Sequence, residues 1–233
     1  MARRLGSRLR IPILYYHEIG PERSRHVVHP DDFAAHVQWL VDAGFEALSL
    51  DAVAEIYGGL RPVPRRPVAI TFDDGRRGVL RHAAPLLARH GLAATCYVVT
   101  DWLDGRGIPD PERYSAFLAW SDLEDLIAAG VEVGSHTASH RNLKKLPPLE
   151  VEREVAGSRK RLEDRLARPV LHFSFPKGRC TRVALGAVRR AGYRTAAATG
   201  ERWNGRLARL HRLARLRVDG LSARGGLAGL LGK

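Results

Sequence analysis

Two adjacent carboxylates follow an apolar segment in the first third of the chain. Residues Val68–Phe72 have the composition of a buried strand, and Asp73, Asp74 and Gly75 come directly after them. Neighbouring side chains of a strand point to opposite faces, but the chain turns where a strand ends, so both acids can face one cavity there. The alternative interpretation is a helix N-cap, since acids are common before a helix. Two acids and a glycine at a strand end modestly favour a functional role.

A pair of histidines follows a second apolar segment. His136 and His140 come after residues 131–135 and lie four positions apart, about one helical turn, so both imidazoles can face one metal ion. Such a pair is weak on its own in a chain with 10 histidines. Its place at a second strand end strengthens it, because two histidines and one aspartate form a three-ligand set that leaves positions for water and substrate.

A tight turn ends a third apolar segment, at Phe175, Pro176, Lys177 and Gly178. Proline and glycine around Lys177 can aim a backbone N–H into a cavity, which is the geometry of an oxyanion donor. The alternative is an ordinary strand-ending turn, which would be preferred if this segment stood alone.

The elements that must position these residues follow from the apolar pattern. Short apolar runs alternate with segments of helical period, and such alternation implies parallel strands. We therefore predict an α/β fold, a distorted (β/α) barrel of about 7–8 parallel strands, with an open doubly wound sheet as the alternative. In either fold the chemistry belongs at the carboxyl ends of the strands. The predicted strands are residues 11–16, 45–50, 68–72, 94–99, 131–135, 170–175, 193–198 and 213–218.

One domain accounts for most of the 233 residues. We predict a basic tail over residues 1–10, a catalytic domain over 11–220 and a glycine-rich tail over 221–233. His26, His29 and His36 lie in or just before a predicted helix, and we expect them to be exposed to solvent.

The charge of the chain favours anionic partners. Lys plus Arg is 38 and Asp plus Glu is 25, a net charge of +13. The arginines are spread along the chain and no nucleic-acid-binding signature accompanies them. Ordinary use of arginine on the surface is therefore the preferred interpretation, and no nucleic-acid partner is expected. Peripheral contact with a membrane or with a lipid-linked substrate stays open as an alternative.

The N-terminal residues do not read as an export signal. The apolar stretch Ile11–Tyr16 is too short for a signal-peptide core, and Arg3-Arg4 lacks the hydrophobic segment of a twin-arginine signal. Cys96 and Cys180 are too few for a disulfide framework and are interpreted as packing residues. The predicted location is cytoplasmic, with the inner face of the membrane as a further option.

The three motifs together resemble those of the polysaccharide deacetylase family, carbohydrate esterase family 4, also called the NodB-homology domain. They read T-F-D-D-G at 71–75, S-H-T-x-x-H at 135–140 and F-x-x-P-x-G at 173–178, in the family's order. The resemblance implies hydrolytic removal of N-acetyl groups from an N-acetylglucosamine-type sugar, oligosaccharide or sugar conjugate. It also implies one divalent metal ion, zinc first, with cobalt, nickel, manganese or iron as alternatives.

The resemblance assigns roles to the matching residues. Asp73 would be the general base that activates water, and the backbone N–H of Lys177 would help to stabilise the oxyanion. The metal would be held by Asp74, His136 and His140. Phe175 and Pro176 would shape the oxyanion and substrate-binding turn.

Two departures from the family pattern concern the orientation of Asp73 and the shape of the groove. Many members have arginine where this chain has Ser174, and tyrosine where it has Lys177. Arg215, on the last predicted strand, could replace the missing arginine; a surface cation at a strand end is the alternative, and the two are weighted equally.

A third departure concerns the general acid. The late L-x-L-H motif of the family is absent, and I-L-Y-Y-H occurs at residues 13–17 instead. This arrangement resembles the rearranged branch that includes the poly-N-acetylglucosamine deacetylases. His17 is therefore the candidate general acid, because an amine leaves only when it is protonated. The alternative is a packing or capping histidine.

Two rival functions remain at this point. One is a hydrolase of the same fold that acts on another C–N bond, in a cyclic imide or an N-formyl sugar. The other is a non-catalytic basic binding domain, against which the complete set of Asp73, Asp74, His136 and His140 argues.

Overall fold

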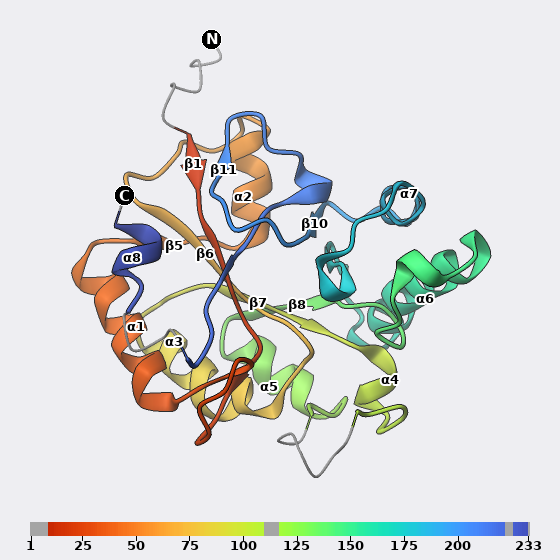
Figure 1. The fold of residues 1–233 in the computed structure, drawn as a ribbon, viewed down its shortest axis with the longest axis horizontal. Coiled ribbons are helices and arrows are strands. Elements are labelled where there is room, and N and C mark those ends of the chain that lie inside the picture. The colour runs from red at the N-terminus through yellow and green to blue at the C-terminus, as the bar shows by residue number, and fades with distance from the viewer. Residues whose placement is uncertain (1–8, 110–116, 222–225, 233) are drawn as a thin grey trace.

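Parallel strands form a curled sheet at the centre of the protein (Figure 1). The structure is a computed structural model, and it describes residues 9–109, 117–221 and 226–232. The strand order is β10-β9-β8-β7-β6-β2-β12, and β5 pairs with the start of β6. The bounds are β2 Ile13–Tyr16, β5 Glu46–Ala47, β6 Pro67–Phe72, β7 Ala94–Val98, β8 Val131–Ser135, β9 His172–Ser174, β10 Thr195–Ala197 and β12 Leu216–Arg217. The predicted distorted (β/α) barrel of parallel strands is confirmed.

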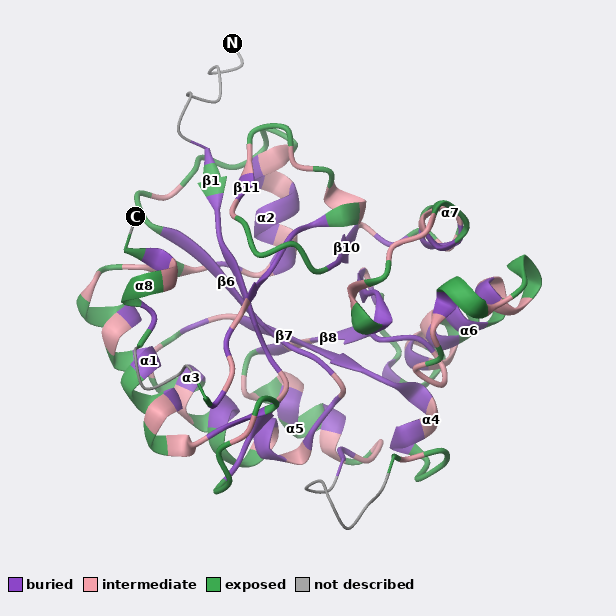
Figure 2. Ribbon diagram, in the orientation of Figure 1, coloured by how far each residue is buried: buried purple, intermediate pink, exposed green. Residues whose placement is uncertain are grey.

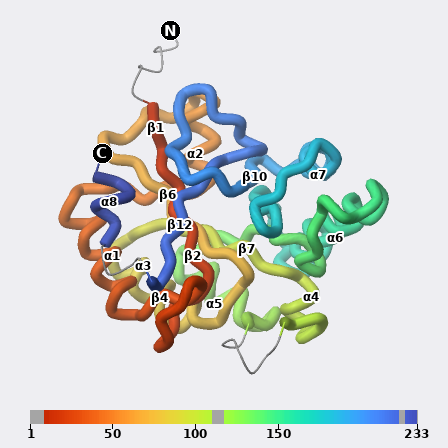
Figure 3. The backbone as a smooth tube through the Cα atoms, in the orientation of Figure 1, coloured from red at the N-terminus to blue at the C-terminus, as the bar shows by residue number. Residues whose placement is uncertain are grey.

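The last strand segment brings the two edges of the sheet together. Leu216 in β12 pairs with Leu14 in β2, while Leu213 forms a parallel bridge with Ala197 in β10. In Figure 3 the strands β2 and β12, near the two ends of the chain, lie side by side. Within the described residues, the segment 213–217 therefore joins the two edges of the sheet and closes the barrel.

Helices cover the outside of the sheet, and the strands are buried on both faces (Figure 2). Helix α1 spans Pro30–Asp42, α3 Ala84–Arg89, α4 Thr100–Leu103, α5 Asp122–Ala128, α6 Pro148–Leu166, α7 Arg182–Arg190 and α8 Ala228–Leu231. A π-helical turn, Val79–Ala83, precedes α3, and short 3₁₀ turns occur at Leu143–Lys145, Pro176–Gly178 and Leu210–Arg212. Two small strand pairs lie outside the main sheet: β1 Arg10–Ile11 with β11 Asn204–Gly205, and β3 Glu18–Ile19 with β4 Val27–Val28.

Helix α2, Leu50–Tyr57, packs against the inside of the barrel instead of covering its outer face. Its Leu50, Val53 and Ile56 pack with Ile13 and Tyr97, which point inward from β2 and β7. Apolar side chains thus fill the barrel interior, and they separate its two ends.

Some predicted elements are shorter than their apolar runs. The predicted strand 45–50 keeps only Glu46–Ala47, because Ser49 caps α2 by accepting a hydrogen bond from Ala52 N at 3.1 Å.

Of the predicted basic tail, residues 1–8 lie outside the described residues. In the predicted glycine-rich tail, Leu227 and Leu231 are buried against the core. No helix in the described ranges combines the length and the apolar character needed to cross a membrane.

Candidate active site

The carboxyl ends of β6, β8 and β9 place the predicted residues around one cavity of about 540 Å³. The first and last strands add residues to the same cavity. Its lining consists of Tyr15, His17, His26, Asp73, Asp74, Arg76, Trp102, Pro109, His136, His140, Lys177, Gly178, Thr199, Arg215 and Arg217.

Left-handed backbone occurs in each of the three strand-end loops. Asp74, His140 and Lys177 have φ values of 76°, 58° and 58°, a conformation that costs a non-glycine residue of order 1–3 kcal/mol. Gly75 follows with φ 68°, and a Cβ there would lie 3.0 Å from Val98. The chain therefore turns sharply enough for Asp73 and Asp74 both to line the cavity.

The three candidate metal ligands converge on one point. Oδ1 of Asp74 lies 3.6 Å from Nε2 of His136 and 3.4 Å from Nε2 of His140. Nδ1 of His136 lies 2.8 Å from the carbonyl oxygen of Ser174, which directs its Nε2 toward Asp74. Ligand atoms of a tetrahedral zinc ion lie roughly 3.4 Å apart, given bonds of about 2.1 Å. The donor types and their spacing therefore fit a single divalent ion.

Asp73 forms a bidentate ion pair with Arg215. Arg215 donates from Nη1 to Oδ1 at 2.8 Å and from Nη2 to Oδ2 at 2.7 Å, and the Asp73 backbone N–H donates to Tyr16 O at 2.9 Å. Burial on its own would raise the pKa of Asp73, but the charges of Arg215 and His136 and the Arg215 hydrogen bonds lower it well below its usual range. The carboxylate is therefore ionised and fixed in orientation.

Arg215 is fully buried, so the surface-cation interpretation of this residue is wrong. Besides Asp73, its guanidinium donates to Ser174 Oγ at 3.0 Å, Thr71 Oγ1 at 3.2 Å and Ala198 O at 3.3 Å. Its charge also lies over the Tyr15 ring, 4.6 Å from the centroid. The small Ser174 side chain thus sits beside a guanidinium that comes from the last strand segment.

His17 lies on the cavity wall just after β2. Its ring is 5.7 Å from that of Tyr15 and 4.9 Å from that of His26, measured between centroids. Burial lowers the pKa of His17, and the nearby carboxylates of Asp74 and Asp73 raise it in part. The structure therefore brings His17 to the same cavity as Asp73 and the three candidate ligands.

The third loop presents Lys177 at the cavity with an exposed side chain. Phe175 and Pro176 are buried; Phe175 N donates to Ala197 O at 3.0 Å, and Gly178 N donates to Phe175 O at 2.8 Å, closing the turn. A Cβ on Gly178 would lie 2.3 Å from Thr199, so the turn requires glycine there.

Several cavity residues were not predicted from the sequence. His26 is exposed, as expected, yet it lines the cavity from the turn between β3 and β4; Arg76 and Arg217 line it as well.

His36, expected at the surface, is buried in α1 with Nδ1 3.3 Å from the Tyr16 hydroxyl. No motif marks these residues, because the long-range packing of the first strands and α1 determines where they lie.

Comparison with known families identifies the class of protein to which this fold and this site belong. The family model described as "Polysaccharide deacetylase" matches residues 61–196. This chain belongs to the polysaccharide deacetylase family, whose hydrolases act on the amide bonds of N-acetyl sugars.

Curated relatives cover different shares of the chain. YxkH of Bacillus subtilis, named as a polysaccharide deacetylase, is 28% identical over 210 residues, which is 90% of this chain and 72% of YxkH. The poly-beta-1,6-N-acetyl-D-glucosamine N-deacetylase of Escherichia coli is 28% identical over 109 residues, 42% of this chain. That match spans only 16% of the E. coli protein.

Solved structures share the fold over nearly the whole chain. The deacetylase PplD of Streptococcus pyogenes, in complex with acetate, superimposes with a TM-score of 0.84 at 24% identity, covering 96% of this chain and 98% of PplD. IcaB of Ammonifex degensii gives a TM-score of 0.79 at 21% identity, covering 96% and 97%.

Proposed function

We propose that this protein removes acetyl groups from N-acetylglucosamine-type units of a polysaccharide, oligosaccharide or sugar conjugate, with the help of one divalent ion. The observation that carries the proposal is the convergence of Asp74, His136 and His140 on one point beside Asp73. Zinc is the first choice of ion, with cobalt, nickel, manganese and iron as alternatives, because a His/His/Asp set selects weakly among them.

Amide hydrolysis needs an activated water, a stabilised oxyanion and a protonated leaving amine. A divalent ion held by Asp74, His136 and His140 would polarise the acetyl carbonyl and make water more acidic. Asp73 accepts the proton of the attacking water, and its ion pair with Arg215 keeps the Asp73 carboxylate ionised and oriented for that step. The Lys177 backbone N–H stabilises the oxyanion, while Phe175 and Pro176 hold its turn in place.

Acetate release from defined substrates tests the function. The purified protein is expected to release acetate from chito-oligosaccharides, β-1,6-linked N-acetylglucosamine oligomers or a glycolipid- or nucleotide-linked N-acetylglucosamine. Chelation should abolish release and added Zn²⁺ should restore it, and His136→Ala should lose both activity and one equivalent of bound metal. Hydrolysis of a cyclic imide or an N-formyl sugar, with no acetate from any N-acetyl sugar, would replace the proposal. Equal metal content in His136→Ala and the wild type would remove the ligand assignment.

We further propose His17 as the general acid that protonates the departing amine. His17→Ala is expected to keep the bound metal and to lower turnover by about 10²–10⁴-fold, the usual effect of losing a general acid. The matched control is His82→Ala, because His82 is exposed and does not line the cavity. Turnover of His17→Ala near that of the control would exclude His17 from proton transfer.

A further inference from the structure

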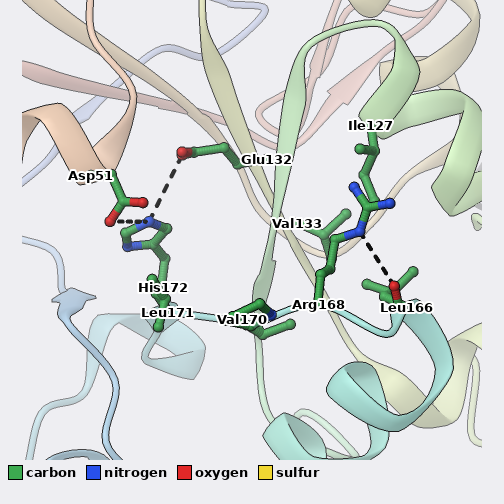
Figure 4. A pocket seen from close by; sticks show the side chains of 10 residues that line it. Asp51, Ile127, Glu132, Val133, Leu166, Arg168, Val170, Leu171 and His172 are labelled. Atoms are coloured by element: carbon green, nitrogen blue, oxygen red, sulfur yellow. Dashed lines mark hydrogen bonds and ion pairs between the residues drawn. The ribbon is translucent and has the colours of Figure 1, made fainter.

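A second cluster of metal-binding residue types lies at the amino ends of the strands, away from the catalytic cavity. It combines Asp51 in the first turn of α2, Glu132 near the start of β8 and His172 at the start of β9. Figure 4 shows the His172 ring directed between the two carboxylates. Three segments that are remote in sequence thus present one histidine and two acids to a common point.

His172 has the orientation of a ligand. It is 3% exposed; its Nδ1 lies 2.9 Å from Thr195 Oγ1, and its Nε2 lies 3.6 Å from Asp51 Oδ1 and 3.9 Å from Glu132 Oε2. The two latter distances exceed hydrogen-bond length. They are instead close to the separation of ligand atoms around one bound ion, roughly 3.4 Å for tetrahedral zinc.

The candidate catalytic cluster has the same local design. There, too, the Nδ1 of a buried strand histidine, His136, is held by a protein oxygen, and its Nε2 lies 3.6 Å from a carboxylate oxygen. In both clusters the partner of Nδ1 orients the ring, so that Nε2 is the nitrogen that faces the carboxylates.

Both carboxylates are held in place and keep capacity for an ion. Glu132 Oε2 accepts hydrogen bonds from Thr95 Oγ1 at 2.9 Å and from Leu50 N at 3.2 Å. Arg194 donates to Asp51 Oδ1 at 2.7 Å, whereas Asp51 Oδ2 accepts no hydrogen bond from any residue in the described ranges. Two acids against one arginine leave an excess of negative charge next to Nε2 of His172.

A path to the cluster exists. A cavity of about 170 Å³ is lined by Asp51, Glu132 and His172 and, on its other side in Figure 4, by Leu166 and Arg168. Asp51 and Glu132 are only partly buried, so an ion can reach the cluster without unfolding of the barrel.

We propose that Asp51, Glu132 and His172 bind a second divalent cation of the zinc or manganese class, which stabilises the fold. The ion joins the first turn of α2 to β8 and β9 and so holds this inner helix against the end of the barrel opposite the active site. The site does not depend on the proposed deacetylation.

Metal binding in a variant without the catalytic cluster tests the second site. His136→Ala/His140→Ala is stripped with chelator and titrated with Zn²⁺ alone, with bound metal measured by elemental analysis and calorimetry. One equivalent is expected to remain, against two in the wild type, and Zn²⁺ should raise the thermal midpoint of this variant because it binds the folded state. Adding Glu132→Gln or His172→Ala should abolish the remaining equivalent and the shift in midpoint, whereas adding His82→Ala should change neither.

Glu132→Gln keeps the size of the side chain and an oxygen for Thr95 and Leu50, so it serves if His172→Ala does not fold. A His136→Ala/His140→Ala variant that binds no Zn²⁺ would overturn the proposal. The proposal would also be overturned if one equivalent of Zn²⁺ still bound after Glu132→Gln and after His172→Ala. The cluster would then be only a network of ion pairs that includes Arg194.

Discussion

Asp73→Asn is expected to lower turnover about 10²–10⁴-fold, the range for loss of a general base, while the bound metal stays. An amide cannot take the proton of the attacking water, whereas the ligand set of Asp74, His136 and His140 is unchanged. The substitution also leaves the buried Arg215 without its counter-charge, so the thermal midpoint should fall. Acetate release, metal content and circular dichroism are measured together, below the midpoint of the variant.

The matched control is Asp164→Asn. Asp164 is exposed on α6 and pairs with Lys160, so its neutralisation should change turnover and stability little. An Asp73→Asn protein that is folded, loaded with metal and as active as this control would take Asp73 out of the reaction.

Arg215→Met is expected to lower the free energy of unfolding by about 3–5 kcal/mol, the usual cost of leaving one partner of a buried ion pair uncompensated. Asp73 and Arg215 are both buried and joined by hydrogen bonds of 2.8 and 2.7 Å. Without the guanidinium, burial raises the pKa of Asp73, and a protonated or misoriented Asp73 no longer accepts a proton. Denaturant unfolding and acetate release measure the two effects.

The double variant Asp73→Asn/Arg215→Met separates stability from catalysis. It contains no unpaired buried charge, so its stability should be higher than the sum of the two single losses predicts, while its turnover stays as low as that of Asp73→Asn. Arg153→Met, at an exposed position of α6, is the control for loss of an arginine. Additive stability losses, or normal turnover in Arg215→Met, would contradict the assignment of Arg215 as the residue that positions Asp73.

Local sequence patterns predict much of the fold and part of the candidate site. Apolar runs mark the strands because a strand that is buried on both faces needs apolar residues throughout, as Val68–Phe72 shows. Polar residues directly after such runs, Asp73 and Asp74 among them, had to lie at the carboxyl edge of a parallel sheet. The ends of elements were less accurate, since caps such as Ser49 decide them.

The sequence by itself therefore determined the class of fold, the order of the three strand-end motifs and their meeting at one edge. Only the tertiary structure decided which remote residues complete each site. Arg215 reaches Asp73 because its segment lies between β10 and β2 in the closed barrel. Asp51 meets Glu132 and His172 because α2 packs on the side chains that point into the barrel at its amino end. The physical reason is that alternation, capping and turn chemistry act over a few residues. Closure of the barrel and packing of its interior instead join segments that are far apart in the sequence, and no local pattern encodes those contacts.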